Sequence, residues 1–313
     1  MSYLPYPPPV HPLPILVKPP GYDESAGYLR HLLDEIERDI IMPLIIRNHV
    51  TVPFKELLKR IVDSYNVNLT TPNERLDFGD SPTRWAYVYV FLMRHSHLVH
   101  TALVEMTKFT QNFVSWQYVR TFDVCAIGGG PATDILGFAL FLKTLNISSD
   151  VQGTVIDKCG EWGDTWTSLH ARTSDLNIKN IDYVTYDLTS EGNVPDEVAT
   201  KIRRAHLVTL TKVVSSLSAF VCKRPAHLRF PFLRAISPGT FVLFIDNESG
   251  PHNGLFREAV SYTSGFRVIA DFHSDMAFPS VSGPSPNHPL VGWLSFFPAK
   301  IGSNRIIFLQ KVC

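Results

Sequence analysis

The sequence lacks the features that mark secreted, zinc-binding and membrane-spanning proteins. Its four cysteines show no CxxC spacing, and the start of the chain has neither a basic region nor an apolar leader. We therefore expect free thiols in a reducing compartment, with no disulfide and no metal site. The longest apolar run, Trp85 to Met93, is far shorter than a membrane span. These absences predict a cytoplasmic protein, with the nucleus as the alternative compartment, that makes no contact with a membrane.

An excess of charge of one sign is also lacking. The 313 residues carry 29 basic and 29 acidic side chains, so no global field attracts nucleic acid. One stretch departs from this balance, because no acidic residue occurs between Val198 and Ile245. The basic residues there are Lys201, Arg203, Arg204, Lys212, Lys223, Arg224, Arg229 and Arg234. Segment 201–234 therefore predicts a patch for RNA or another anionic substrate, against the alternative of scattered solvated charges.

Length and composition predict one large α/β domain with an appendage, since 45% of the residues are hydrophobic and 19% charged. Residues 1–20 hold eight prolines and predict an extended tail, with a partner groove for proline-rich peptides as the functional alternative. Residues 21–118 show apolar positions at helical spacing and predict a helical block across the mouth of a sheet. Residues 119–313 are expected to form the α/β domain itself.

Two groups of side chains in the helical block could serve a site. A helix is expected to start with Ser81 as its cap and Pro82 at its first position, and to run, with a break, to about Trp116. On it we weigh a histidine group as a metal site and an aromatic group as a pocket wall. Ordinary polar positions and core packing are the preferred interpretations, since no carboxylate or cysteine completes a metal set. The groups are His95, His97 and His100, and Trp85, Tyr87, Tyr89 and Phe91.

The segment from Phe122 to Asp134, FDVCAIGGGPATD, carries the strongest functional signal. An apolar run from Val124 to Ile127 enters three glycines, and a helical pattern follows with Pro131 in its first turn. Glycines allow a sharp turn at positive φ and let a ligand lie against the backbone. The NH groups at the helix start would face that ligand. Alone, such a turn also occurs in loops that bind nothing.

Acidic residues follow the next two expected strands. Asp157 comes directly after Thr154 to Ile156, and Asp187 comes directly after Tyr183 to Tyr186. Because ligands of parallel sheets bind at the carboxyl ends of the strands, we expect both carboxylates on one rim beside the glycine turn. Two acids and a turn on one edge are a more specific signal than the turn alone.

The order of GGGPATD, Asp157 and Asp187 resembles the class I S-adenosylmethionine-dependent methyltransferases, over about residues 122–313. The resemblance implies a doubly wound, mostly parallel sheet of seven strands. It also implies that the turn passes under the amino-acid end of S-adenosylmethionine, that Asp157 holds the ribose and that Asp187 meets the adenine amine. The cofactor contacts expected on this basis are Gly128, Gly129, Gly130, Asp134, Asp157, Lys158, Trp162, Asp187, Leu188 and Thr211.

The sequence after the third strand agrees with this family except at one position. The remaining strands are expected at 206–210, 240–245, 267–272 and 305–311, with a Pro-, Ser- and Gly-rich loop at 279–289 before the last. The Asn-Pro-Pro-Tyr or Asp-Pro-Pro-Tyr of amino-group methyltransferases is absent after the fourth strand, where Thr209-Leu210-Thr211-Lys212 stands instead. The methyl acceptor is therefore open. Lys212 and Asp246, at the ends of the fourth and fifth strands, are the candidate catalytic residues.

Two other functions compete with methyl transfer. A methyltransferase fold could sense S-adenosylmethionine or scaffold partners without turnover, which the missing acceptor motif favours. A flavin or nicotinamide oxidoreductase could use the same glycine turn, but Thr133 and Asp134 stand where its third glycine is expected. Trp162 or Trp166 could stack on an adenine or pack under the next helix. The oligomeric state is open.

Overall fold

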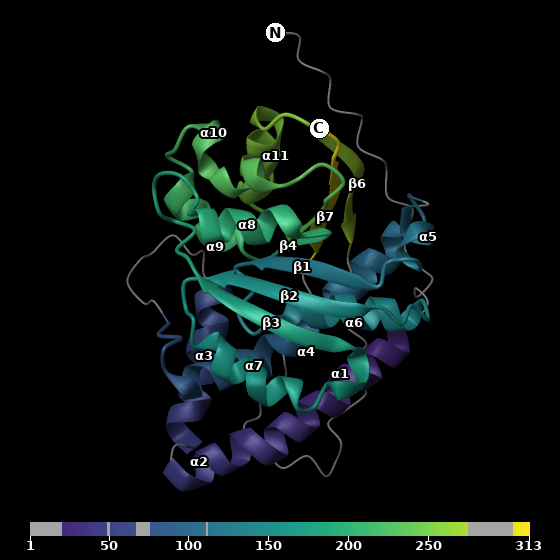
Figure 1. Ribbon diagram of the computed structural model, residues 1–313. Helices are drawn as coiled ribbons and strands as arrows, with labels where there is room; N and C mark the ends of the chain where they lie inside the picture. The colour runs from purple at the N-terminus through teal and green to yellow at the C-terminus, as the bar shows by residue number, and fades with distance from the viewer. Residues whose placement is uncertain (1–20, 49–50, 67–75, 111, 275–302) are drawn as a thin grey trace.

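The computed structural model describes residues 21–48, 51–66, 76–110, 112–274 and 303–313 (Figure 1). The proline-rich tail at 1–20 and the loop at 279–289 lie outside the described residues.

One sheet of seven strands, in the order β3-β2-β1-β4-β5-β7-β6, forms the centre of the molecule (Figure 1). The strands β1 to β5 are parallel to one another, and β7 runs antiparallel to both β5 and β6. This confirms the doubly wound, mostly parallel sheet expected for the class I methyltransferase fold. The strands are β1 (Thr121–Ile127), β2 (Asp150–Asp157), β3 (Ile178–Thr185), β4 (Leu207–Thr211), β5 (Phe241–Asn247), β6 (Phe266–Ser274) and β7 (Asn304–Lys311).

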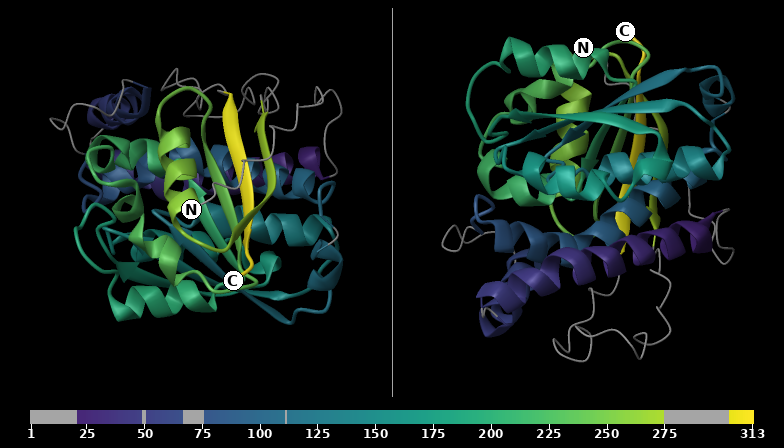
Figure 2. Two further views of the ribbon diagram at one scale, coloured as in Figure 1. Left: turned by 90° about the horizontal axis from the view of Figure 1, so that it is seen from above. Right: turned by 60° about the horizontal axis from the view of Figure 1, so that its bottom comes forward.

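Helices cover both faces of the sheet, each over its own apolar core. One face carries α8 (Asp196–Arg204), α9 (Val214–Val221), α10 (Ala226–Arg229) and α11 (His252–Tyr262). The other carries α6 (Thr133–Thr144) and α7 (Trp162–His170), with the helical block beyond them (Figures 1 and 2). That block comprises α1 (Tyr22–Ile36), a π-helical turn (Glu37–Ile41), α2 (Met42–Asn48), α3 (Thr51–Asn66), α4 (Ser81–Met106) and α5 (Asn112–Trp116).

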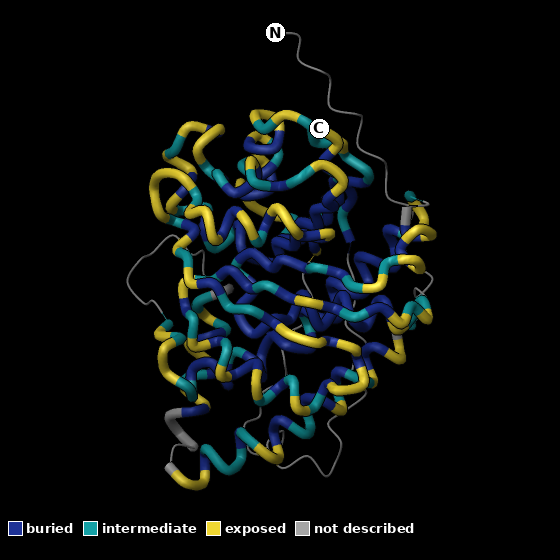
Figure 3. Tube along the Cα trace, in the orientation of Figure 1, coloured by how far each residue is buried: buried dark blue, intermediate teal, exposed yellow. Residues whose placement is uncertain are grey.

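Helix α4 joins the helical block to the sheet. It begins one residue earlier than expected, because Asp80 and not Ser81 is the cap, and Asp80 Oδ2 accepts a hydrogen bond from Thr83 N at 3.0 Å. Its backbone lies directly against α6 at Gly137, a residue of α6. A Cβ placed on Gly137 would be 2.4 Å from the carbonyl oxygen of Ser96 in α4. Most of its residues are buried (Figure 3). The block therefore packs on the face of the sheet next to α6, and only partly across the mouth.

The histidines of α4 fix this packing. His97 Nδ1 lies 3.0 Å from Ser25 Oγ of α1, and His100 Nε2 lies 2.9 Å from Thr144 Oγ1 of α6. Burial lowers the pKa of His97 to about 3 and that of His100 to about 4, so both rings are neutral at pH 7. Within the described residues, no group of three or more His, Cys, Asp or Glu side chains is arranged to hold a metal ion. No helix in the described part of the chain is long and apolar enough to cross a membrane.

Candidate functional site

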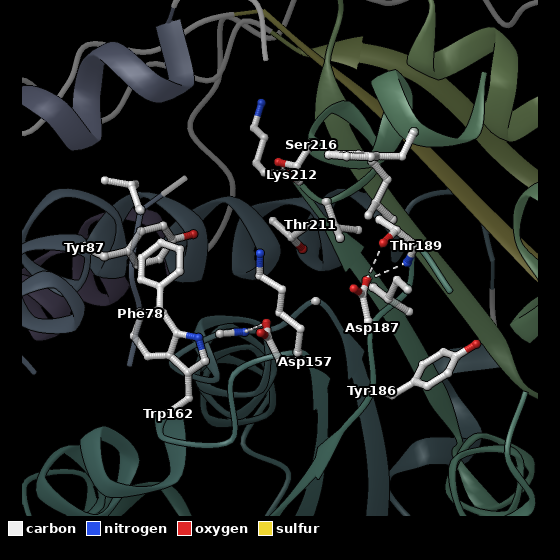
Figure 4. A pocket seen from close by; sticks show the side chains of 18 of the residues that line it. Phe78, Tyr87, Asp157, Trp162, Tyr186, Asp187, Thr189, Thr211, Lys212 and Ser216 are labelled. Atoms are coloured by element: carbon white, nitrogen blue, oxygen red, sulfur yellow. Dashed lines mark hydrogen bonds between the residues drawn. The ribbon is translucent and has the colours of Figure 1, made fainter. Parts of the chain in front are cut away.

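A cavity of about 250 Å³ opens at the carboxyl ends of the parallel strands (Figure 4). Its floor comes from the turn after β1 and from the ends of β2, β3 and β4. Most of the expected contact residues meet there, although they are spread over some 85 positions of the sequence. Those lining the cavity are Gly128, Gly130, Asp157, Lys158, Trp162, Asp187, Leu188, Thr211 and Lys212.

The glycine turn has the backbone geometry that its sequence predicts. Gly128 has φ +63° and Gly130 φ +47°, a region that disfavours residues with a Cβ. A Cβ on Gly128 would lie 2.3 Å from Val213 Cγ2, so the chain leaves no room for one. Helix α6 begins only at Thr133, after Ala132 in a left-handed conformation. Pro131 therefore precedes the helix, instead of occupying its first turn, because the turn needs two further residues.

Asp157 is fixed by the turn beside it. Its Oδ2 accepts a hydrogen bond from Gly130 N at 3.1 Å, and its Oδ1 accepts one from Cys159 N at 3.1 Å. Burial raises the pKa of the Asp157 carboxyl, and these two NH groups oppose the shift. Each oxygen keeps a lone pair for a ligand, so the carboxylate can accept two further hydrogen bonds in a fixed orientation.

Asp187 lies across the cavity from the glycine turn, on the loop after β3. Its Oδ1 accepts hydrogen bonds from Thr189 N at 2.8 Å and Thr189 Oγ1 at 2.6 Å, which hold the carboxylate at the rim (Figure 4). The side chain is exposed, and Leu188 beside it is buried. A polar edge above an apolar floor suits a planar, nitrogen-rich ring.

Trp162 lies on the opposite side of the cavity from Asp187 (Figure 4). It packs with Phe78 and Tyr87 at ring-centroid distances of 5.2 and 5.5 Å, and only 2% of its surface is exposed. A ring so enclosed is a wall of the cavity, and packing is favoured over stacking on a ligand. Trp166 is likewise buried and does not line the cavity.

Lys212 departs from an ordinary strand end. It has φ +60°, and its ammonium donates hydrogen bonds to Asn247 Oδ1 at 2.6 Å and Asn304 Oδ1 at 2.5 Å. Burial lowers its pKa to about 8, and the neighbouring carboxylate of Asp246 opposes the shift. The side chain points away from Asp157 and Asp187 (Figure 4). Lys212 therefore ties β4 to β5 and β7 and lines the cavity mainly by its stem.

Asp246 lies behind the cavity. It is fully buried, and its Oδ2 accepts a hydrogen bond from Ser215 N and its Oδ1 one from Asn247 N, both at 2.8 Å. His252 Nε2 lies 3.8 Å from it. Asp246 is not part of the cavity lining, and its hydrogen bond to Ser215 N holds the start of α9 in place.

Asp134 and Gly129 also lie outside the cavity wall. A Cβ on Gly129 would meet Ala126, within the turn itself. The carboxyl of Asp134 is 98% buried, and burial raises its pKa to about 6, while the hydroxyls of Thr209, Thr211 and Thr133 partly oppose the shift. Its Oδ2 has no hydrogen-bond partner among the described residues. Asp134 is thus a buried acid beneath the glycine turn.

Asp134 should make the stability of the protein depend on pH. Its pKa is about 6 in the folded state against an ordinary 3.8, so the folded state binds more protons between these values, and stability falls as pH rises through that range. The variant Asp134→Asn removes this loss of stability, because an asparagine side chain does not ionise. We expect the variant to match the wild type near pH 4 and to exceed it by about 1–3 kcal/mol at pH 7.5 in urea unfolding.

The control for this prediction is Asp164→Asn on α7, where the side chain is exposed. Because Asp164 lies in the first turn of α7, its loss should change the free energy of unfolding only slightly, by up to about 1 kcal/mol. A difference between Asp134→Asn and the wild type that stays constant from pH 4 to pH 7.5 would refute the assignment.

Acids from outside the basic segment 201–234 pair with part of it in the described structure. Lys201 pairs with Asp182 at 2.5 Å, and Arg229 pairs with Glu258. Arg234 Nη2 donates to the carbonyl of His227 at 2.6 Å, and Lys212 is buried. Arg203, Arg204 and Lys223 are exposed, so the patch for RNA or another anionic substrate stays a prediction beside the alternative of scattered solvated charges.

Several cavity residues carry no signal that singles them out in the sequence. Ser64, Leu76 and Phe78 come from the helical block and close one side. Ser216, Leu217 and Phe220 of α9 close the other. The first group lies far from the glycine turn in sequence, and only the packing of α4 on α6 brings it near. The second group follows the fourth strand, where the resemblance places ligand contacts, so its position offered a weak signal.

No family model and no curated protein matches this sequence. Among solved structures, the chain is similar to a proposed class I S-adenosylmethionine-dependent methyltransferase from Listeria monocytogenes, at 14% identity and TM-score 0.40, over 93% of this chain and 89% of that one. It is similar to a proposed sarcosine dimethylglycine methyltransferase from Galdieria sulphuraria, at 10% and 0.39, over 82% and 98%. It is also similar to precorrin-6y C5,15-methyltransferase from Geobacter metallireducens, at 8% and 0.37, over 67% and 86%. Because these values are low, the strand order and the cavity carry the functional argument.

Proposed function

We propose that this protein binds S-adenosylmethionine in the cavity at the carboxyl edge of its sheet and transfers the methyl group to an acceptor. The observation that carries the proposal is the meeting of the glycine turn, Asp157 and the Asp187-Leu188 pair around one cavity. These groups come from three separate strand ends. They offer a close backbone approach, a carboxylate for two hydroxyls, and an acidic edge for an exocyclic amine.

The residues present fit such a cofactor. Gly128 and Gly130 both line the cavity, so the backbone of the turn is accessible to the amino-acid end of a ligand. Asp157 keeps a free lone pair on each oxygen toward the cavity. Leu188 and Leu217 provide apolar surface beside Asp187 for a purine. Bound S-adenosylmethionine would supply an electrophilic methyl group.

The contribution of the chain to the reaction is positioning. The described cavity wall holds the acids Asp157 and Asp187 in hydrogen bonds to backbone NH groups, and Lys212 in hydrogen bonds to two amides. Lys212, with a pKa of about 8, is mainly protonated at pH 7, and the hydrogen bonds that the two carboxylates accept make them weaker bases. Alignment of an already nucleophilic acceptor is then the main source of rate enhancement, and the enclosed aromatic wall excludes water.

The same observation supports a second candidate, a non-catalytic sensor or scaffold that binds S-adenosylmethionine without turnover. It is favoured by the engagement of Lys212 and by the burial of Asp246, the two side chains expected to contact an acceptor. A flavin or nicotinamide oxidoreductase is disfavoured by the sheet, because the dinucleotide-binding order 3-2-1-4-5-6 lacks the antiparallel β7 found here.

Transfer and sensing are separated by a labelling experiment. The protein is incubated with S-adenosylmethionine labelled in its methyl group, together with separate RNA, protein and small-molecule fractions of a cell extract. We expect label in the small-molecule fraction, because Phe78, Tyr87 and Trp162 wall one side of the cavity and restrict the size of an acceptor. Label in RNA would contradict this acceptor class, and tight binding without label in any fraction would favour the sensor.

A further inference from the structure

The segment 76–80, directly before α4, forms part of the cavity wall and contains no helix or strand. Leu76 and Phe78 line the cavity, and Phe78 lies on the same side of it as Tyr87 and Trp162 (Figure 4). The Phe78 ring packs edge-on against Tyr87 at a centroid distance of 5.4 Å. Because the segment belongs to no helix or sheet, its carbonyl groups need hydrogen-bond donors from elsewhere.

Arg84, near the start of α4, supplies these donors. Its Nη1 donates hydrogen bonds to the carbonyl oxygens of Phe78 and Gly79, both at 2.8 Å. Its Nε donates a hydrogen bond to Thr165 Oγ1 of α7 at 2.9 Å. One guanidinium therefore joins segment 76–80 and α4 to α7. A lysine could not replace it fully, because a guanidinium has five N–H donors in a fixed plane and an ammonium is a single point charge.

The position of Arg84 is costly for a positive charge. Only 5% of its surface is exposed, and it makes no ion pair among the described residues. The three acceptors of its hydrogen bonds are two carbonyls and a hydroxyl, all of them neutral. Burial of a cation without an ion pair costs free energy that an apolar side chain would not cost. Packing alone therefore does not account for an arginine at this position.

Cys159 contacts the same segment from the cavity floor. Its thiol lies 3.2 Å from the carbonyl oxygen of Phe78 and 3.2 Å from Glu161 Oε2, and it can donate to either. The backbone NH of Cys159 donates to Asp157 Oδ1 at 3.1 Å. Segment 76–80 is therefore held next to the residue that also fixes the Asp157 carboxylate.

We propose that Arg84 is a positioning residue of this site, which holds segment 76–80 against α7 so that Phe78 covers one side of a bound nucleoside and slows its release. The proposal rests on the proposed function, because the nucleoside is S-adenosylmethionine or its product S-adenosylhomocysteine. Arg84 does not line the cavity itself and acts through Phe78.

The test measures the association and dissociation rate constants of S-adenosylhomocysteine by stopped-flow tryptophan fluorescence, since Trp162 in the cavity wall reports binding. The variants are Arg84→Met, Arg84→Lys, Phe78→Ala and the double variant Arg84→Met/Phe78→Ala. The matched control is Arg172→Met, just after α7, where Arg172 Nη1 donates to the carbonyl of Ser168 at 2.8 Å and does not line the cavity. Circular dichroism gives the folded fraction of each variant.

Arg84→Met and Phe78→Ala should each raise the dissociation rate constant by about 10- to 100-fold, with a smaller change in the association rate constant. The double variant should release the ligand no faster than Phe78→Ala alone, because Arg84 acts through Phe78. Arg84→Lys should lie between the wild type and Arg84→Met. Arg172→Met should match the wild type.

A purely structural role would reduce the fraction of protein that binds and leave the rate constants of the folded fraction unchanged. Wild-type rate constants in Arg84→Met, or effects of the two single variants that multiply in the double variant, would therefore overturn the positioning role. If Arg84→Met does not fold, Arg84→Lys and its double variant with Phe78→Ala provide the same comparison. Failure of the proposed function is distinct, because the wild type itself would then not bind S-adenosylhomocysteine.

Discussion

Replacing Asp157 with alanine is expected to weaken binding of S-adenosylmethionine by about 100- to 1000-fold. The side chain would lose two charge-assisted hydrogen bonds to the ribose, each worth about 1.5–3 kcal/mol. It would also release Gly130 N, which Asp157 Oδ2 holds at 3.1 Å, and so loosen the glycine turn. Isothermal titration calorimetry of the wild type and the variant measures the change directly.

Two further variants make this result specific. Asp157→Asn keeps the size of the side chain but loses its charge and one acceptor oxygen, so an intermediate loss of affinity is expected. Asp150→Ala removes an acid from the first residue of the same strand, where Asp150 pairs with Lys179 at 3.3 Å. It should bind like the wild type. A change of less than threefold in Asp157→Ala would show that this carboxylate does not hold the ribose.

The largest expected loss of stability is that of Gly137→Ala, at the crossing of α4 and α6. The added Cβ would lie 2.4 Å from the carbonyl oxygen of Ser96 and 2.8 Å from Val99 Cβ. The clash can be removed only if the backbone of α4 shifts away from α6. The cost of overpacking, about 1–3 kcal/mol, should therefore exceed the gain in helix propensity of about 1 kcal/mol. Urea unfolding should show a lower midpoint.

Gly27→Ala in α1 is the matched control, because an added Cβ there meets nothing within 4 Å. It should raise stability by up to about 1 kcal/mol. If Gly137→Ala is as stable as Gly27→Ala, α4 does not pack against α6 as described. A single unfolding transition in both variants would support the helical block and the sheet as one cooperative unit.

The glycine turn and its two acids could be predicted from the sequence because local rules determine them. Gly128 and Gly130 do adopt positive φ, and Asp157 does end β2. The sequence pattern placed most of the strands within a few residues of their observed bounds. The exception is β3, which starts at Ile178, five residues before the expected Tyr183. It is an edge strand with exposed polar residues at its start, so its apolar pattern is weak there.

The parts of the site that escaped prediction depend on packing between distant segments. Asp246 follows an apolar run, as a rim acid would, yet it is still part of β5 and turns toward Ser215 N behind the cavity. Trp162 stands in a loop that could reach an adenine, but Phe78 of the helical block encloses it.

The account depends most on the identity of the ligand at the carboxyl edge of the sheet. The direct test is calorimetric titration of S-adenosylmethionine and S-adenosylhomocysteine into the wild-type protein, with flavin adenine dinucleotide and nicotinamide adenine dinucleotide as controls. Saturable binding of the two sulfur nucleosides, and of neither control, is the predicted result. Binding of a flavin or nicotinamide cofactor instead, or of no nucleotide, would contradict the assignment of the cavity.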